Sequence, residues 1–184
     1  MMGTMPRNID YLCLDDTALL AQCDLHTYKS SGPGGQHRNK VSSAIRLKHR
    51  PTGISAHGDD SRSQHENKRL AISRLRMNIA CQLRQAIDPA TVAIPAVVAE
   101  CMFVARGGEA KGRKRLEVGP KDHRFWQVAC FLLDLLEACK GQLSSAAACL
   151  GITTSNLASL LESQRHLFAS AQQIRKIHGL KPLQ

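Results

Sequence analysis

Two alternating segments joined by a short turn restrict the fold of this chain more than any other feature of its sequence. Residues 43–50 (SAIRLKHR) alternate between apolar and polar side chains, and residues 54–58 (ISAHG) can form a return strand. Between them lies Pro51-Thr52-Gly53, where the glycine can supply the turn conformation. Alternation with a period of two is typical of a strand with one buried face. We therefore predict a β-hairpin.

One further strand and an amphipathic helix are expected to flank the hairpin. Residues 24–30 (DLHTYKS) also alternate, and they lead into a glycine-rich stretch. A short helix is possible over residues 16–22. From Ser61 onward the pattern becomes helical, and Asp88-Pro89 is expected to end the helix. Its apolar positions are Ile72, Leu75, Ile79, Leu83 and Ala86. The first half is therefore predicted to be α+β, with a small sheet packed against one amphipathic helix.

The last third of the chain is predicted to be helical. Residues 123–141 (HRFWQVACFLLDLLEACKG) are apolar nearly all round, which indicates a buried helix. Residues 143–162 resemble a helix-turn-helix, with a break at Gly151 and a threonine cap before the second helix. That second helix carries no Arg or Lys, which argues against a reader of DNA. A final helix over residues 170–179 is expected to end at a glycine.

The middle of the chain is less regular. Residues 88–105 are ambiguous between strand and helix, and the stretch after them is basic and rich in glycine. We expect four segments: an N-terminal lead-in over 1–23, a domain over 24–105, a basic linker over 106–122 and a helical segment over 123–184.

Composition points to a polyanionic partner. The chain has 25 Lys plus Arg against 15 Asp plus Glu, a formal charge of +10. Nucleic acid is the simplest partner of such a chain, although membrane headgroups would also fit the charge. Aromatic residues make up 4% of the sequence, too few for a platform that stacks several bases.

Cysteine spacing argues against a metal centre. The seven cysteines include no C-x-x-C pair and no Cys/His pair at zinc-ligand spacing, so we expect reduced thiols, no metal and no cofactor. No signal peptide is apparent. The longest apolar stretch is broken by Pro95 and Glu100, so no membrane segment is expected. The protein is expected to be cytoplasmic and monomeric.

The glycine-rich stretch 30–40 (SSGPGGQHRNK) is the candidate functional loop. Adjacent glycines reach backbone conformations closed to other residues and let a substrate approach the main chain. Ordering such a loop costs roughly 1–2 kcal/mol per residue. The stretch lacks the Gly-Lys-Ser/Thr ending of a P-loop and the spacing of a dinucleotide fingerprint. An ordinary flexible turn remains an alternative if the glycines are considered alone.

The residues around this loop resemble the catalytic domain of class I peptide chain release factors. The likeness covers about Asp24 to Arg84, a third of the chain. Its signature is the Gly-Gly-Gln tripeptide, here Gly34, Gly35 and Gln36. The motifs that follow in the family's order are Asn39-Lys40, the Ser-Ala-Ile-Arg-Leu strand, Pro51-Thr52-Gly53 and Arg62-Ser63-Gln64.

This resemblance implies hydrolysis of the peptidyl-tRNA ester in the large-subunit active centre of the ribosome. The backbone N–H and the side-chain amide of Gln36 would act at the reacting centre, and Gly34 and Gly35 would permit the backbone path. A glutamine methyltransferase that modifies Gln36 is a possible further partner. The residues expected to contact ribosomal RNA or tRNA are Ser31, His37, Arg38, Asn39, Lys40, Arg62, Gln64 and Lys68.

The roles of three arginines and three histidines are less clearly indicated by the sequence. Arg74, Arg76 and Arg84 are read either as RNA contacts or as a solvated helix face. The histidines at positions 49, 57 and 65 are expected to be ordinary surface residues.

The chain also departs from stop-codon-reading release factors. About two dozen residues precede Asp24, so a codon-reading domain is not expected. The resemblance then favours rescue of stalled ribosomes, with residues 106–121 as a short basic arm. One alternative is a non-catalytic RNA- or DNA-binding protein that uses the helix-turn-helix-like unit. Another is a release factor whose codon recognition comes from a partner protein.

Overall fold

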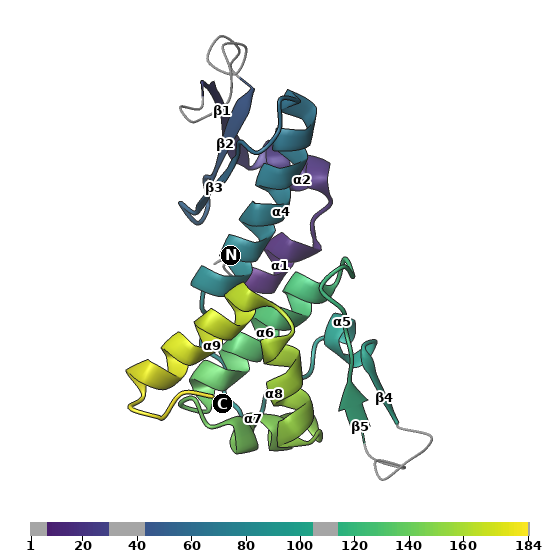
Figure 1. Ribbon diagram of the computed structural model, residues 1–184. Helices are drawn as coiled ribbons and strands as arrows, with labels where there is room; N and C mark the ends of the chain where they lie inside the picture. The colour runs from purple at the N-terminus through teal and green to yellow at the C-terminus, as the bar shows by residue number, and fades with distance from the viewer. Residues whose placement is uncertain (1–6, 30–42, 105–113, 184) are drawn as a thin grey trace, which may run out of the picture. The chain divides into compact units, whose positions relative to one another are not determined.

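The fold consists of two compact units, residues 1–79 and residues 80–184, and each is described by itself. The structure is a computed structural model that describes residues 7–29, 43–104 and 114–183 (Figure 1). In the first unit two short helices precede a three-stranded sheet, and a long helix follows it. These elements are α1 (Asn8–Cys13), α2 (Asp16–Ala21), β1 (Cys23–Tyr28), β2 (Ala44–His49), β3 (Ser55–Gly58) and α4 (Gln64–Gln82), the last of which ends in the second unit.

The predicted hairpin is confirmed. Strands β2 and β3 are antiparallel, with Ile45 paired to Gly58 and Leu47 to Ala56. Gly53 adopts φ +72 in the turn, a conformation that side-chain-bearing residues rarely adopt. Strand β1 adds to the other edge of β2, so the sheet order is β1-β2-β3. Strands β1 and β2, which precede and follow the glycine-rich stretch in the sequence, are therefore neighbours in the sheet.

Helix α4 packs against the sheet, as Figure 1 shows, and the α+β prediction for this half is confirmed. The buried residues of the helix include Ala71, Leu75 and Ile79. The approach is close at Gly58, where an added Cβ would lie 2.0 Å from the carbonyl oxygen of Asn67. The sheet and helix can therefore meet at this point only because position 58 has no side chain.

The end of α4 differs from the prediction. The helix ends at Gln82, well before Asp88-Pro89. The Arg84 guanidinium donates to the carbonyl oxygen of Ala80, and the backbone N–H of Gln85 donates to Oδ1 of Asp134 at 3.1 Å. The Arg84 side chain thus binds a carbonyl of the last helical turn, and the Asp134 carboxylate binds a backbone N–H just beyond it. These contacts replace hydrogen bonds within the helix, so the helix ends before the proline.

The second unit is mainly helical, as predicted, and a two-stranded ribbon is added to it. Its elements are α5 (Ala96–Ala99), β4 (Met102–Val104), β5 (Lys114–Leu116), α6 (Phe125–Ala138), α7 (Leu143–Leu150), α8 (Thr154–Glu162) and α9 (Arg165–Ile177). Helix α6 is buried on almost every side. Leu132, Leu133, Leu135 and Leu136 are at most 1% exposed, so α6 is the core around which the unit forms.

The ambiguous stretch 88–105 resolves into both kinds of structure, helix α5 and strand β4. Strand β5 pairs antiparallel with β4, and Leu116 lies opposite Met102. Leu116 and Val118 are buried. Residues 114–118, which the sequence predicted as linker, therefore belong to the packed second unit. Their apolar side chains were hidden in the sequence by the basic residues around them.

The α7–α8 pair has the turn chemistry that the sequence predicted. Gly151 adopts φ +66 at the end of α7, and the Thr153 side chain accepts a hydrogen bond from the N–H of Asn156 at the start of α8. None of the helices among the described residues is long and apolar enough to cross a membrane.

Candidate functional site

The glycine-rich stretch leaves and returns to the sheet at a single point. Tyr28, the last residue of β1, is the cross-strand partner of Ala44, the first residue of β2. The described residues that flank positions 30–42 are therefore held by the same pair of strands. Eight of the predicted site residues lie outside the described residues, so their roles stay predictions: Ser31, Gly34, Gly35, Gln36, His37, Arg38, Asn39 and Lys40.

Asn67 anchors the return end of this stretch. Its side chain, 0% exposed, donates through Nδ2 to the carbonyl oxygens of Ser43 and Ser61, at 2.8 and 2.7 Å. Its Oδ1 accepts from the N–H of Ser61 at 2.9 Å. Because a buried amide with unmade hydrogen bonds is costly, this arrangement fixes the residue before β2 against the first turns of α4.

Tyr28 anchors the departing end. Its hydroxyl lies 3.1 Å from Nδ1 of His57 on β3, and the two rings meet edge to face. Burial, reinforced by the nearby Asp59, raises the pKa of the Tyr28 phenol above its ordinary value. The phenol therefore remains protonated at neutral pH and can donate a hydrogen bond to Nδ1 of His57.

Arg74 holds the loop between β3 and α4. Its guanidinium donates to the carbonyl oxygen of His57 and to Oδ1 of Asp60, both at 2.9 Å. The hydrogen bond from Arg74 is the largest cause of the lowered pKa of the Asp60 carboxyl. The loop that carries Arg62 is thus tied to both the strand before it and the helix after it.

Three predicted RNA-contacting residues lie at the start of α4 or just before it. Arg62 and Gln64 are exposed, and Lys68 is half-buried one turn further along. All three lie on the segment that Asn67 and Arg74 fix. Their placement on one fixed segment is compatible with a shared contact to an RNA backbone, which stays a prediction.

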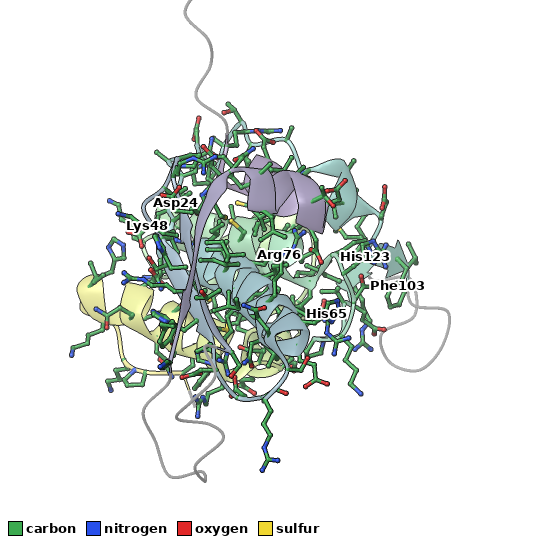
Figure 2. The ribbon with its side chains drawn as sticks, turned by 90° about the horizontal axis from the view of Figure 1, so that it is seen from above. Asp24, Lys48, His65, Arg76, Phe103 and His123 are labelled. Atoms are coloured by element: carbon green, nitrogen blue, oxygen red, sulfur yellow. The ribbon has the colours of Figure 1, made fainter. Side chains whose placement is uncertain are left out.

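Two exposed cations on the sheet were missed by the sequence reasoning. Arg46 and Lys48 alternate with buried residues along β2, so both lie on its solvent side. Arg46 is paired in register with His26 and His57, and Lys48 with Asp24 (Figure 2). The alternation of residues 43–50 could have revealed this basic face, because alternate side chains share one face of a strand.

The prediction that His49 is a surface residue is wrong. The ring is 0% exposed, its Nε2 lies 3.1 Å from Oε1 of Gln22, and its Nδ1 lies 2.9 Å from Oγ1 of Thr52. Burial, with a further contribution from Arg50, lowers the pKa of His49. A neutral ring with the proton on Nε2 satisfies both partners, so His49 is a structural residue of the sheet.

The three arginines named in the sequence analysis, Arg74 and Arg76 of α4 and Arg84 just beyond it, bind groups of the protein instead of forming a solvated face. Arg76 donates to the carbonyl oxygens of Leu12 and Leu14, at 2.9 and 2.7 Å, and pairs with Asp16. Figure 2 shows its side chain. Arg84 lies 3.0 Å from the buried carboxylate of Asp134. With Arg74 also engaged, none of the three is a free cation for a partner.

The α7–α8 pair is engaged with the ribbon at the start of its second helix. The Asn156 carboxamide accepts from the N–H of Leu116 at 2.8 Å and donates to the same residue's carbonyl oxygen at 3.0 Å. The side chain thus pairs with β5 as a neighbouring strand would. A role of this pair in nucleic-acid binding stays a prediction. Within the described ranges no group of three or more His, Cys, Asp or Glu could hold a metal ion.

Comparison with known proteins finds matches to the part of the chain that contains the three-stranded sheet. Residues 19–97 match the family model described as the RF-1 domain, which is less than half of the chain. Peptide chain release factor 1 of Mesoplasma florum is 53% identical over 55 residues, covering 30% of this chain and 15% of that protein. Peptide chain release factor 1 of Leptothrix cholodnii is 46% identical over 65 residues, covering 35% and 18%. Peptide chain release factor 2 of an Acidovorax species is 55% identical over 53 residues, covering 29% and 14%.

These matches show what this part of the chain is similar to. Residues 19–97 resemble the RF-1 domain, and shorter stretches are similar to peptide chain release factors 1 and 2. The chain spans less than a fifth of the length of these curated relatives. The family match begins in α2 and ends in α5, so it contains the whole sheet and both anchors of the glycine-rich stretch.

Proposed function

We propose that this protein hydrolyses the ester of peptidyl-tRNA on the ribosome, with Gln36 as the catalytic residue. The observation that carries the proposal is the pairing of Tyr28 with Ala44 at the base of the Gly-Gly-Gln stretch, inside an RF-1 domain. A base held by two paired strands can present functional residues to a partner while the domain stays folded.

The chemistry assigned to the loop is limited to backbone and amide groups. The N–H of Gln36 would stabilise the negative charge that develops in the transition state, and Gly34 and Gly35 would let the main chain approach the ester. The Gln36 side chain would favour water over an amine as the attacking group. No metal or cofactor enters this proposal.

The free energies involved require that the ribosome supply most of the catalysis. One preorganised oxyanion donor is worth about 2.7–4 kcal/mol, whereas even modest enzymes lower the barrier by about 8 kcal/mol. Positioning of the substrate can supply roughly 7–11 kcal/mol, and the ribosome fixes the end of the tRNA. The isolated protein should therefore hydrolyse free peptidyl-tRNA slowly.

Contact with the large-subunit RNA would run through the exposed cations near the loop base. Arg62, Gln64 and Lys68 are the described members of the predicted set, and Arg46 and Lys48 extend it across the sheet face. Phosphate contacts of this kind position a protein and make its binding depend on salt.

We further propose that release does not need a stop codon, so that the protein acts on stalled ribosomes as a cytoplasmic monomer. The support is the helical second unit, which would dock the chain in place of a codon reader. A glutamine methyltransferase acting on Gln36 is part of the same proposal.

The experiment measures release of labelled peptide from ribosomes programmed with a messenger that lacks a stop codon. The unmodified chain should release peptide, whereas Gln36→Ala and Gly35→Ala should lose most of the activity and still bind ribosomes. Unchanged release by Gln36→Ala would refute the catalytic assignment. Release only with a stop codon in the A site would refute the codon-independent part.

A further inference from the structure

The C-terminal tail is held in place by the side chains of α9. Gly179 turns the chain with φ +70, and the N–H of Leu180 donates to the carbonyl oxygen of Arg175 at 2.9 Å. The Gln172 carboxamide then pairs with both backbone groups of Leu183, at 3.1 and 2.9 Å. These hydrogen bonds hold residues 180–183 against α9.

One guanidinium joins the tail to the turn between α6 and α7. Arg175 donates through Nε and Nη2 to the carbonyl oxygen of Lys181, at 3.0 and 2.7 Å, and through Nη1 to that of Gly141 at 2.7 Å. The packing is tight, because an added Cβ at Gly141 would lie 3.1 Å from Leu180 and 3.2 Å from Arg175. Three segments are thereby fixed around one side chain.

This junction gathers three exposed lysines, Lys140, Lys176 and Lys181, which we call the basic corner. Lys140 precedes Gly141, Lys176 follows Arg175, and the backbone carbonyl of Lys181 is bound by Arg175. In the part of the chain that the structure describes, none of the three forms a salt bridge. Lys140 also adopts φ +51, a conformation in which glycine or asparagine is more usual.

The surroundings of the basic corner leave its charge uncompensated. Helix α9 contains no Asp or Glu. The carboxylate of Glu137, three residues before Lys140, is bound to Nε2 of His178 at 2.9 Å. By contrast, α8 carries no Lys or Arg.

We propose that the basic corner binds the phosphate backbone of RNA, in addition to the RNA contacts proposed for the RF-1 domain. The choice of RNA as the polyanion rests on the proposed function. Three lysines whose backbones meet at one junction, with the nearby Glu137 carboxylate bound to His178, suit phosphate groups, which lysine binds as a point charge. The second unit thus contacts RNA through the α6–α7 turn, α9 and the tail, and α8 takes no part in reading it.

The test uses the full chain with all three lysines changed together, Lys140→Gln, Lys176→Gln and Lys181→Gln. Binding to purified ribosomes and to a short RNA duplex is measured across a salt series. The plot of log affinity against log salt has a negative slope. Loss of three phosphate contacts should make that slope shallower by about 2–3. Release at saturating protein should stay unchanged, because Gln36 is intact.

Two controls separate this surface from net charge. The variant Arg7→Gln, Arg69→Gln, Arg165→Gln removes the same charge from exposed positions outside the basic corner and outside residues 106–121, and changing the basic corner to three arginines keeps the charge. The proposal expects a full slope change only in the basic-corner Gln variant. An equal change in the Arg7 set, or no change in the basic-corner Gln variant, overturns it.

Two further readouts keep this inference distinct from the proposed function. A slope change on RNA with no peptide release by any variant would refute the catalytic proposal and leave the basic corner standing. A loss of binding seen only with phosphatidylglycerol vesicles, and not with ribosomes or duplex, would assign the surface to a membrane and overturn the inference.

Discussion

The carboxamide of Asn67 lies 2.8 Å from the carbonyl oxygen of Ser43, the residue that precedes β2. This hydrogen bond joins the long helix to the return end of the Gly-Gly-Gln stretch. Helix α4 therefore supports the base of the candidate loop and also covers the sheet. The predictions below test this support and three other contacts on which the two units depend.

Asn67→Ala should slow peptide release and lower stability together. The change leaves the carbonyls of Ser43 and Ser61 and one N–H without their partner, at a cost of about 2–4 kcal/mol in unfolding free energy. Urea unfolding and release at saturating protein are the measurements. The matched control is Asn78→Ala, which removes a hydrogen bond from the same helix to Ser55, away from the loop base. If both variants slow release equally, Asn67 has no special role at the loop.

Gly58→Ala should destabilise the first unit severely. The new Cβ would meet the Asn67 carbonyl oxygen at 2.0 Å and the Ala71 nitrogen at 3.0 Å, so helix and sheet must separate. Overpacking of this kind costs about 1–3 kcal/mol or more. Gly119→Ala is the control, because nothing lies within 4 Å of its added Cβ. Thermal unfolding of both variants measures the difference, and an unchanged midpoint for Gly58→Ala would contradict the observed approach.

Stability should fall on mild acidification because of His49. Its folded-state pKa lies below the ordinary value of 6.5, so the unfolded chain takes up the proton first as the pH falls. The stabilising contribution is complete above the unfolded pKa and is lost as the pH falls toward and through the folded pKa. Urea unfolding at successive pH values measures it. His49→Gln should remove this part of the dependence, whereas the exposed His26→Gln should keep it. Equal behaviour of the two variants would contradict the assignment.

Asn156→Ala should release the ribbon from the helices of the second unit. Both hydrogen bonds to the Leu116 backbone disappear, and the exchange of the Leu116 amide hydrogen should accelerate as the local opening free energy falls by about 1–3 kcal/mol. Hydrogen exchange followed by NMR measures this amide directly. The control is Ser155→Ala, which changes the exposed residue before Asn156. In this variant the exchange rate of the Leu116 amide should not change. Protection that survives in Asn156→Ala would show that β4 alone holds the strand.

The resemblance to a release factor domain could be predicted from the sequence because its motifs are local, whereas the site residues stay predictions. The Gly-Gly-Gln tripeptide and the residues 62–64 that follow it in the family's order identified the domain that the comparisons bear out. The supporting contacts could not be predicted in this way. Asn67 reaches back to Ser43, and Tyr28 reaches forward to His57, across separations that no local pattern reports.

The sequence by itself determined the elements whose cause is local. Alternation of residues 43–50 specified a strand, Gly53 and Gly151 specified turns through their backbone freedom, and the apolar run after residue 123 specified a buried helix. Only the tertiary structure decided the fate of the polar groups. Arg76 binds carbonyls about sixty residues away, His49 is enclosed between Gln22 and Thr52, and Asp134 meets the chain where α4 ends. The physical reason is that period and backbone preference depend on neighbouring residues, whereas a buried polar group finds its partner only when distant segments pack together.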